Sequence, residues 1–335
     1  MKTLRSHAVG GPETLTLDEV AVPEPGPGQV RVAVRACAIN FPDTIIIRDM
    51  YQMKPPRPFA PGGELAGVIE AVGDGVTDWH VGDRVIASTG FGGLAEKVVV
   101  DTRQLFAMPA GASFETGASL FLTYGTTIHG LKDRGHLKAG DTLLVLGAAG
   151  GVGISAIELG KANGARVVAA VSSEQKAAFA RQCGADETVI YGRPPFDKEQ
   201  SKALAEAFKA ACGPGGANVI FDIVGGDYSE PALRSIAWEG RFLVVGFPAG
   251  IARLPLNLTL LKSCDVCGVF WGAFAAREPA RNAAHIKELF ALLKDGKINP
   301  RISARYPLEQ GAEAIRVLQD REAVGKVVVT MGDQS

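Results

Sequence analysis

The sequence predicts an α/β protein with two domains, one of which is a doubly wound parallel sheet. With 335 residues, the chain exceeds the usual size of a single hydrophobic core. From about residue 140 to about residue 270, near-continuous apolar strands alternate with helical segments, which is typical of a parallel sheet covered on both faces. Residues 1 to about 120 contain short strands separated by Gly, Asp and Pro turns, which indicates a second, β-rich domain.

Alternation and turn residues define the elements of the β-rich part. Its predicted strands are QVRVAVRACAIN, GVIEAVG, DRVIAST and AEKVVV. At Ser113 the pattern changes, because a capping serine and an acidic residue two positions later open a run with apolar residues at helical spacing. This run, SFETGASLFLTYGTTIHGLKD, is predicted to be helical.

The parallel sheet follows from six apolar runs in the second part of the chain. These predicted strands are TLLVLG, RVVAAV, ETVIY, VIFDIVG, RFLVVG and DVCGVFW. Between them lie helices such as GISAIELGKANG and SEQKAAFARQCG, and FWGAFAAREP is predicted to be a turn. An amphipathic helix, NAAHIKELFALLKDGKI, is expected to end at Gly296, and the tail supplies a loop, a helix and a closing strand.

Composition excludes several classes of partner. The net charge is −1, so no sequence-wide attraction to nucleic acid or anionic lipid is expected. The N-terminus lacks the apolar core of a signal peptide, and no apolar run approaches the ~20 residues of a membrane-spanning helix. The five cysteines are scattered and odd in number. We therefore expect a cytoplasmic protein without nucleic-acid or membrane partners.

A glycine-rich loop marks a nucleotide site. The segment GAAGGVG lies between a strand and a helix, where the pyrophosphate of a dinucleotide meets the amides of a helix N-terminus. Ala148 occupies the first glycine position of the usual fingerprint. The following strand, which ends at Val171, favours a nucleotide site over a plain strand-to-helix turn. The residues expected to cradle the pyrophosphate are Ala149, Gly150, Gly151, Val152 and Gly153.

Five sequence blocks occur in the order and spacing of a known superfamily. They are NFPDTIII at 40–47, PFAPGGELAGVIEAVGDGV at 58–76, GDRV at 82–85, GAAGGVG, and GKVVV at 325–329. Over nearly its full length the chain resembles the medium-chain dehydrogenase/reductase superfamily, and within it the zinc-free NADPH:quinone oxidoreductase branch that includes zeta-crystallin. The resemblance implies a GroES-like catalytic domain of residues 1–122 and 300–335 around a Rossmann domain of residues 123–299.

The resemblance also implies that no catalytic zinc is bound. In zinc alcohol dehydrogenases a cysteine ligand stands at the position of Asn40 and a histidine ligand at that of Gly63, and Glu64 alone cannot hold the ion. The cysteine-rich lobe for structural zinc is also absent. Cys264 and Cys267 form a CxxC, but no second pair lies nearby to complete a metal site. We expect no metal.

The end of the second strand indicates which nicotinamide cofactor binds. NAD-specific sites place a carboxylate about twenty residues past the glycines, and Ser172 and Ser173 stand there instead, followed by Lys176. Two hydroxyls and an ammonium suit the 2′-phosphate of NADPH. By resemblance, Tyr191 faces the same phosphate. The alternative is a helix cap with a solvated lysine, and Glu174 would weaken phosphate binding.

The resemblance implies the residues around the nicotinamide. Asn40 and Asp43 would lie beside the ring and Thr126 would contact it, although Asp43 could instead cap the next segment and Thr126 could be a helix residue. Phe247 and Phe270 would line the walls, or else belong to the core. Lys326 would reach the cofactor. The candidate catalytic residues are Tyr51, Asn40, Asp43 and Thr126.

Tyr51 has two interpretations. In enoyl-thioester reductases of this superfamily, a tyrosine in the matching loop is the proton donor, and a phenol is protonated at neutral pH. Alternatively, Tyr51 is an aromatic lid over a flat substrate, since quinones take their proton from water. The histidines show no catalytic pattern. His129 lies on a predicted helix, and His7, His80, His136 and His285 are expected at the surface.

These features predict a zinc-independent NADPH-dependent reductase of quinones or similar conjugated carbonyls. One alternative is an enoyl-thioester or alkenal reductase of the same fold. An alternative of another class is an NADPH-binding structural or RNA-binding protein of the crystallin type, which the low net charge does not favour. By resemblance, SCDVCGVFWG is the edge strand through which relatives pair two-fold, so a homodimer is expected.

Overall fold

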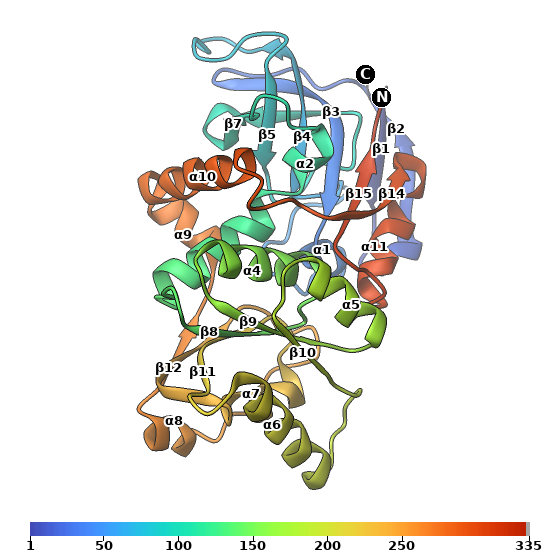
Figure 1. Cartoon of the computed structure of the whole chain (residues 1–335). Coiled ribbons are helices and arrows are strands. Elements are labelled where there is room, and N and C mark those ends of the chain that lie inside the picture. Colours follow the sequence, from blue (N-terminus) through green and yellow to red (C-terminus); the bar gives the residue numbers. More distant parts are fainter. Residues whose placement is uncertain (333–335) are drawn as a thin grey trace. The chain divides into compact units, whose positions relative to one another are not determined.

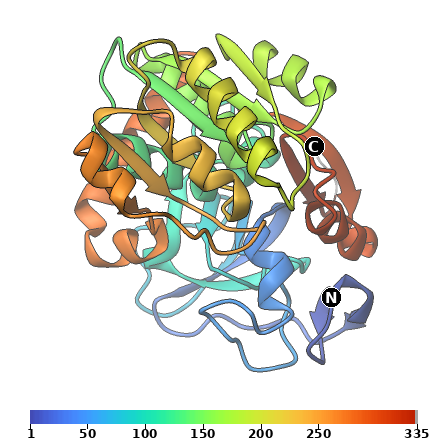
Figure 2. The same ribbon diagram turned by 90° about the horizontal axis from the view of Figure 1, so that it is seen from below.

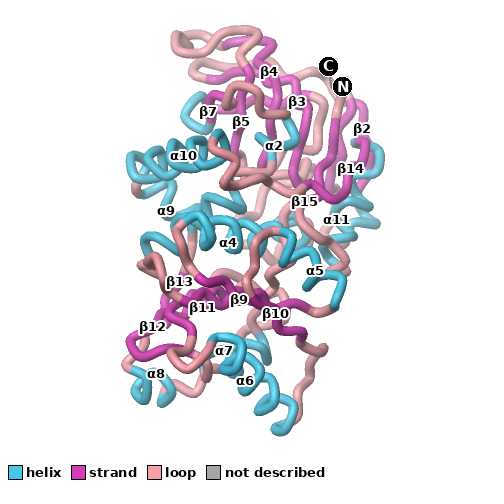
Figure 3. Tube along the Cα trace, viewed as in Figure 1, coloured by secondary structure: helices cyan, strands magenta, loops and turns pink. Residues whose placement is uncertain are grey.

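The computed structural model describes residues 1–332, and this part of the chain divides into two compact units. Unit 1 comprises Met1–Leu122 together with the segment that begins at Pro300. Unit 2 comprises Thr123–Asn299. Figure 3 shows that strands dominate unit 1, whereas in unit 2 helices flank a single sheet.

Unit 1 is built on a seven-stranded sheet with the order β14-β15-β3-β4-β5-β7, and β6 pairs with β3 as well. A separate ribbon of β1 and β2 appears in dark blue in Figure 2. The strands are β1 Lys2–Ser6, β2 Leu15–Glu19, β3 Gln29–Ile39, β4 Glu64–Val72, β5 Arg84–Ser88, β6 Lys97–Asp101, β7 Leu105–Ala107, β14 Ile302–Pro307 and β15 Lys326–Thr330. The helices are α1 Phe41–Ile46, α2 Phe114–Ala118 and α11 Gly311–Gln319, with 3-10 turns at Pro12–Thr14, Thr102–Gln104 and Leu308–Gln310.

The pairing of β15 with β3 positions the site described below. Both strands are apolar and buried, and they run antiparallel with Val327 opposite Ile39. Lys326 therefore comes next to the carboxyl end of β3, where the chain turns into α1 at Asn40. The tail was expected to contribute a loop before its helix, but RISARYP forms β14, which pairs in parallel with β15.

Unit 2 is a six-stranded sheet with the order β10-β9-β8-β11-β12-β13, and every pairing in it is parallel. The predicted doubly wound sheet is thus confirmed. Helices α4 and α5 cover one face, and α6 and α7 cover the other (Figure 1). The strands are β8 Thr142–Leu146, β9 Arg166–Val171, β10 Glu187–Ile190, β11 Ala217–Asp222, β12 Ile236–Val244 and β13 Asp265–Gly268. The helices are α4 Gly151–Ala162, α5 Glu174–Gln182, α6 Lys198–Cys212, α7 Ser229–Leu233, α8 Asn257–Lys262, α9 Trp271–Arg277 and α10 Pro279–Lys294, with a 3-10 turn at Gly226–Tyr228.

The helical run predicted from Ser113 onward is confirmed, but it is not a uniform α-helix. The Ser113 hydroxyl accepts a hydrogen bond from the Thr116 amide, as expected of a cap. After α2, the π-helical turns Phe121–Gly125 and His129–Arg134 flank the short helix α3, Thr126–Ile128. Such π turns are rare and occur often near functional sites.

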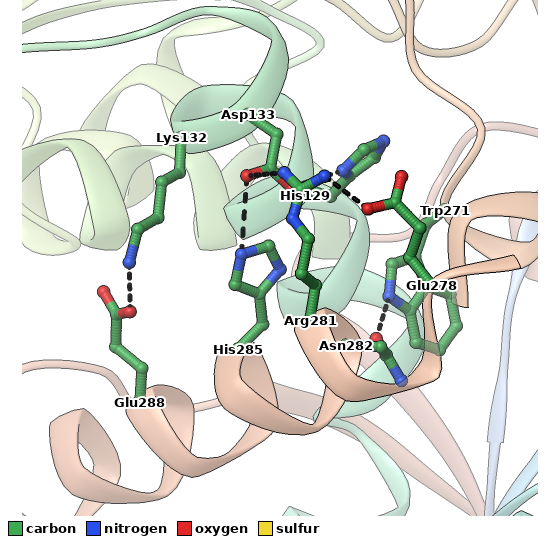
Figure 4. Close-up of polar contacts among 9 residues, drawn as sticks. All are labelled: His129, Lys132, Asp133, Trp271, Glu278, Arg281, Asn282, His285 and Glu288. Atoms are coloured by element: carbon green, nitrogen blue, oxygen red, sulfur yellow. Dashed lines mark hydrogen bonds and ion pairs between the residues drawn. The ribbon is translucent and has the colours of Figure 1, made fainter.

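Two expectations about the region before Gly296 were wrong. The segment predicted to be a turn, FWGAFAAREP, contains α9, which packs on α10 through a hydrogen bond from the Trp271 indole to Asn282. His285, expected at the surface, is buried on α10 and faces Asp133 (Figure 4). An amphipathic helix normally turns its polar residues outward, but here a carboxylate from another element draws the imidazole inward. No helix within residues 1–332 is long and apolar enough to cross a membrane.

Candidate functional site

A buried polar cluster lies in unit 1 where β3 ends. We call Asn40, Asp43, Glu64 and Lys326 the Asn40 cluster; all four are at most 5% exposed. Asn40 is the N-cap of α1, Glu64 begins β4 and Lys326 begins β15. The sheet pairs both β4 and β15 with β3, so residues that are hundreds of positions apart in sequence become neighbours.

Every polar atom of the Asn40 side chain is engaged. Its Oδ1 accepts a hydrogen bond from Lys326 Nζ at 2.6 Å. Its Nδ2 donates to Glu64 Oε2 at 3.1 Å and to the Ala38 carbonyl at 3.2 Å. Because an ammonium has no lone pair and a carboxylate has no proton to donate, these neighbours fix the orientation of the amide.

Asp43 caps the backbone, as one of its two interpretations required. Its carboxylate accepts hydrogen bonds from the Asn40 amide at 2.8 Å and from the Gly62 amide at 2.9 Å. Burial raises the pKa of Asp43 to about 6, although these two hydrogen bonds and the charge of Lys326 oppose the increase.

Glu64 and Lys326 form a buried ion pair, with 3.8 Å between Lys326 Nζ and Glu64 Oε2. Burial raises the pKa of Glu64 and lowers that of Lys326, and the opposite charge of each partner counteracts the effect of burial. The Leu122 amide also donates to Glu64 Oε1 at 3.0 Å. Loss of either residue would leave the other charge buried without its ion-pair partner.

The residues at the positions of zinc ligands in zinc alcohol dehydrogenases do not fit a zinc ion. Asn40 is held by Lys326 and Glu64, and a Cβ placed on Gly63 would lie 2.8 Å from the carbonyl oxygen of Gly90. A histidine at position 63 would therefore need the backbone at Gly90 to move. Among residues 1–332, no group of three or more His, Cys, Asp or Glu side chains is arranged to hold a metal.

Tyr51 is half-buried at the edge of the unit 1 core. Burial raises the pKa of its phenol, and the negative charge of Asp43 raises it further. The phenol is accordingly protonated at neutral pH, which suits a proton donor and an aromatic lid equally well.

In unit 2, the predicted glycine loop joins β8 to α4. Gly150 is the N-cap of α4 and has no side chain that could bond the amides of the first helical turn. A Cβ on Gly153 would lie 2.4 Å from the carbonyl oxygen of Gly147, so the helix packs on the loop only with glycine there. A Cβ on Gly150 would have one neighbour, at 3.7 Å. This open cradle of amides fits the pyrophosphate of a dinucleotide.

The end of β9 carries no carboxylate. Ser172 is exposed, and the Ser173 hydroxyl accepts a hydrogen bond from the Lys176 amide at 3.3 Å, which confirms the helix-cap interpretation of this serine. Glu174, which would repel a phosphate, pairs with Arg181 at 3.1 Å. These side chains leave Ser172 as an exposed hydroxyl beside a helix N-terminus, where anions are stabilised.

Tyr191 lies beside the same strand end but points into the core. Its backbone amide donates to the Val171 carbonyl at 2.9 Å. Its ring is 8% exposed and contacts the Tyr228 ring at 4.6 Å between centroids. The resemblance implied that Tyr191 faces a phosphate; the ring contact described for it is with Tyr228, and a role toward the phosphate stays a prediction.

Thr126, Phe247 and Phe270 also belong to unit 2. Thr126 begins the short helix α3, as the helix interpretation stated. Phe247 and Phe270 are 53% and 57% exposed, so the core interpretation of both was wrong. They follow the carboxyl ends of β12 and β13, the edge of the sheet at which the glycine loop and Ser172 also lie.

Two parts of this arrangement were not predicted from the sequence. The pairing of Glu64 with Lys326 was not foreseen, although an isolated Glu at the start of an apolar strand was a signal. The loop after β11 was also missed. There the buried Asp222 carboxylate binds the amides of Val224 and Gly225 and the Ser229 hydroxyl, which fixes the loop at the same sheet edge.

Comparison with known proteins finds relatives along the whole chain. Residues 26–110 match the family described as alcohol dehydrogenase GroES-like domain, and residues 151–288 match the family described as zinc-binding dehydrogenase. Quinone oxidoreductase-like protein 2 of Rattus norvegicus is 37% identical, with coverage of 95% of this chain and 89% of the relative. Quinone oxidoreductase of Homo sapiens is 31% identical, with coverage of 99% and 98%.

A solved structure agrees with both units. The crystal structure of Escherichia coli quinone oxidoreductase complexed with NADPH has a TM-score of 0.89 and 28% identity, with coverage of 99% of this chain and all of the other. The predicted fold class, a GroES-like domain with a Rossmann domain, is thereby confirmed.

Proposed function

Because the chain belongs to the medium-chain dehydrogenase/reductase superfamily, in its quinone oxidoreductase-like branch, we propose that it is a zinc-independent enzyme that transfers hydride from NADPH to a quinone. The observation that carries this proposal is the Asn40 cluster. Where zinc enzymes of the superfamily bind a cation between side-chain ligands, Lys326 supplies the positive charge next to Glu64. A metal Lewis acid is not needed, because a quinone is already electron-poor.

The cofactor would be held mainly by unit 2. NADPH would supply the hydride, while the protein binds and orients it. Residues 149–153 would surround the pyrophosphate, with the amides of the first turn of α4 as donors, and Ser172 with Lys176 would bind the 2′-phosphate. The absence of a carboxylate at the end of β9 supports NADPH over NADH. Thr126, Phe247 and Phe270 would border the nicotinamide.

Unit 1 would supply the groups that act near the acceptor. Asn40 would orient the nicotinamide through its side-chain amide, and Asp43 would keep the turn at Asn40 rigid through its two backbone hydrogen bonds. For a quinone, water can supply the proton after hydride transfer. Tyr51 would then serve as a lid over the flat ring.

The half-buried phenol of Tyr51 is also compatible with one alternative function. A protonated Tyr51 of raised pKa could complete the reduction of an enoyl thioester or alkenal by protonating the carbon next to the carbonyl. Tyr51→Phe separates the two functions. We expect it to slow quinone reduction by less than about tenfold, whereas it would abolish an enoyl reduction that depends on the phenol.

The first experiment follows NADPH oxidation optically, with a metal chelator present, on ortho-quinones, para-quinones and a short enoyl thioester. We expect turnover of a quinone, preference for NADPH over NADH, and no effect of the chelator. Inhibition by the chelator would contradict zinc independence, and turnover of the enoyl thioester alone would assign the protein to double-bond reduction.

We also propose that two copies pair through β13 in the cytoplasm. Within residues 1–332, β13 pairs only with β12, and the side chain of Val266 on it is 40% exposed. An exposed edge strand of this kind is a ready template for a second copy. All five cysteines are free thiols, as expected of a reducing compartment.

A further inference from the structure

In the Asn40 cluster, nearly all hydrogen-bonding groups of the Asn40 side chain are already used, which hydride transfer by itself does not require. A side-chain amide offers two N–H donors and two lone pairs on its oxygen. Both donors of Asn40 are used, one by Glu64 and one by the Ala38 carbonyl. One lone pair is used by Lys326. Among the contacts of residues 1–332, the capacity that remains to the Asn40 side chain is therefore a single acceptor site on Oδ1.

Glu64 and Lys326, together with the Ala38 carbonyl, determine this polarity. If Asn40 were rotated by half a turn about its amide, its NH₂ group would face an ammonium and its oxygen would face a carboxylate. Both contacts would be repulsive, and all of these groups are nearly solvent-free. The two charged residues thus act as positioning residues for Asn40.

We infer that Glu64 and Lys326 lock Asn40 as a pure hydrogen-bond acceptor, and that this acceptor selects a nicotinamide by the N–H of its carboxamide. The inference rests on the proposed function, since it assumes that Asn40 meets the nicotinamide. Its first chemical consequence concerns the 3-acetylpyridine analogue of NADPH, in which a methyl group replaces the carboxamide NH₂. That analogue has no donor for Asn40.

The energetics of buried charges indicate which substitutions of Glu64 and Lys326 test the inference. Removing one partner of a buried ion pair leaves the other uncompensated and is strongly destabilising, whereas replacing both partners by neutral groups of similar size is tolerated. Glu64→Gln and Lys326→Met should each lower the denaturant midpoint of the cofactor-free protein. The double variant E64Q/K326M should unfold at a higher denaturant concentration than either single variant.

The double variant should separate the effect of the ion pair on the stability of the protein from its effect on the orientation of the Asn40 amide. With a neutral amide in place of the Glu64 carboxylate and no ammonium, only the Ala38 carbonyl still favours the wild-type orientation of the Asn40 amide, so the reversed orientation costs much less than in the wild type, because a glutamine side chain both donates and accepts. We expect the wild type to bind NADPH more tightly than its 3-acetylpyridine analogue. In E64Q/K326M the ratio of the two dissociation constants should fall by roughly fivefold, the value of one ordinary hydrogen bond.

A matched control is available in unit 2. Glu158 is also buried, and it accepts hydrogen bonds from the Tyr124 hydroxyl at 2.7 Å and from the Asn299 amide at 2.8 Å. Glu158→Gln should reduce stability without changing the ratio of dissociation constants. This control shows whether loss of a buried carboxylate is by itself sufficient to alter discrimination.

The experiment measures both dissociation constants by nicotinamide fluorescence and the denaturant midpoints of the cofactor-free variants. A double variant that regains stability and loses discrimination supports the inference. A double variant that keeps the wild-type ratio, or single variants whose effects on stability simply add, would overturn it. If the wild type binds no NADPH, the proposed function fails together with the cofactor half of the inference, and the stability cycle still decides whether Glu64 and Lys326 act as a pair.

Discussion

Two glycines of the loop after β8 differ in what a side chain would meet. A Cβ on Gly153 would press on the backbone of Gly147 and Ala148 at 2.4–2.6 Å, whereas a Cβ on Gly150 would have one neighbour, the Gly147 carbonyl oxygen at the ordinary contact distance of 3.7 Å. The backbone of Gly150 is extended, with φ −80°, which alanine adopts without strain. The two positions are therefore glycine for different reasons, one for packing and one for access.

Gly153→Ala should destabilise the protein by about 1–3 kcal/mol through overpacking. Gly150→Ala should change stability by less than about 0.5 kcal/mol but weaken NADPH binding by about tenfold or more, because its methyl group enters the space proposed for the pyrophosphate. Urea denaturation and fluorescence titration measure the two effects. Equal stability losses in both variants would contradict this division of roles.

In unit 2 the Asp133 carboxylate connects two elements, the π-helical turn His129–Arg134 and helix α10. It binds His129 at 2.8 Å, Arg281 at 2.8 Å and His285 at 3.6 Å, so it ties this turn to α10 (Figure 4). The ring of Phe274 on α9 stacks against both imidazoles. Within residues 1–332, Nδ1 of His285 has no hydrogen-bond partner.

This arrangement predicts how stability depends on pH. Burial lowers the pKa of His285 below its usual 6.5, although the charge of Asp133 opposes this, and Lys132, Glu288 and His129 also face the ring. Below about pH 6.5 the unfolded chain therefore binds a proton at this histidine that the folded chain does not, and stability falls as the pH falls. The slope from one such group is at most about 1.4 kcal/mol per pH unit.

Denaturant unfolding between about pH 7.5 and pH 5 measures that slope. His285→Phe, which fills the site without a titrating group, should make the curve flatter, and the exposed His136→Gln should leave it unchanged. Below about pH 4 a second loss of stability is expected, because the unfolded chain then takes up a proton at Asp133 that the folded chain does not. Burial opposes ionisation of Asp133, but the hydrogen bond from His129 and the charges of His285 and Arg281 outweigh it and lower the pKa of Asp133. A wild-type curve that is flat across the first interval would contradict the role of His285.

An element could be predicted from the sequence where the local residue pattern determines it, and could not where contacts with distant residues determine it. The strands of unit 2 are near-continuous apolar runs, such as TLLVL in β8 and RVVAAV in β9, so their local pattern was sufficient. Helices α1 and α9 have only six and seven residues, too few for a periodic signal. The buried position of His285 depends on Asp133, which lies far earlier in the chain, and no local pattern carries that information.

At the scale of the whole molecule, unit 1 is assembled from both ends of the chain. β15 lies between β14 and β3, and it brings Lys326 to Glu64. The motif that contains Asn40 was visible in the sequence, but its partner comes from a strand that begins 286 residues later. Candidate residues could thus be named from the sequence, whereas the polarity that Lys326 imposes on Asn40 could only be found in the fold.

The stability of unit 1 should therefore depend on a strand far from its other residues in sequence. Val328 is fully buried in β15 opposite Ala38, so Val328→Asp would place an unpaired carboxylate in the core of unit 1. We expect at least about 3 kcal/mol of destabilisation, with loss of the soluble protein or a large shift of its urea midpoint. Thr330→Asp, at the half-buried end of the same strand, is the matched control and should cost much less. Equal effects of the two substitutions would contradict an interior position of β15 between β14 and β3. The proposed role of Lys326 depends on that position.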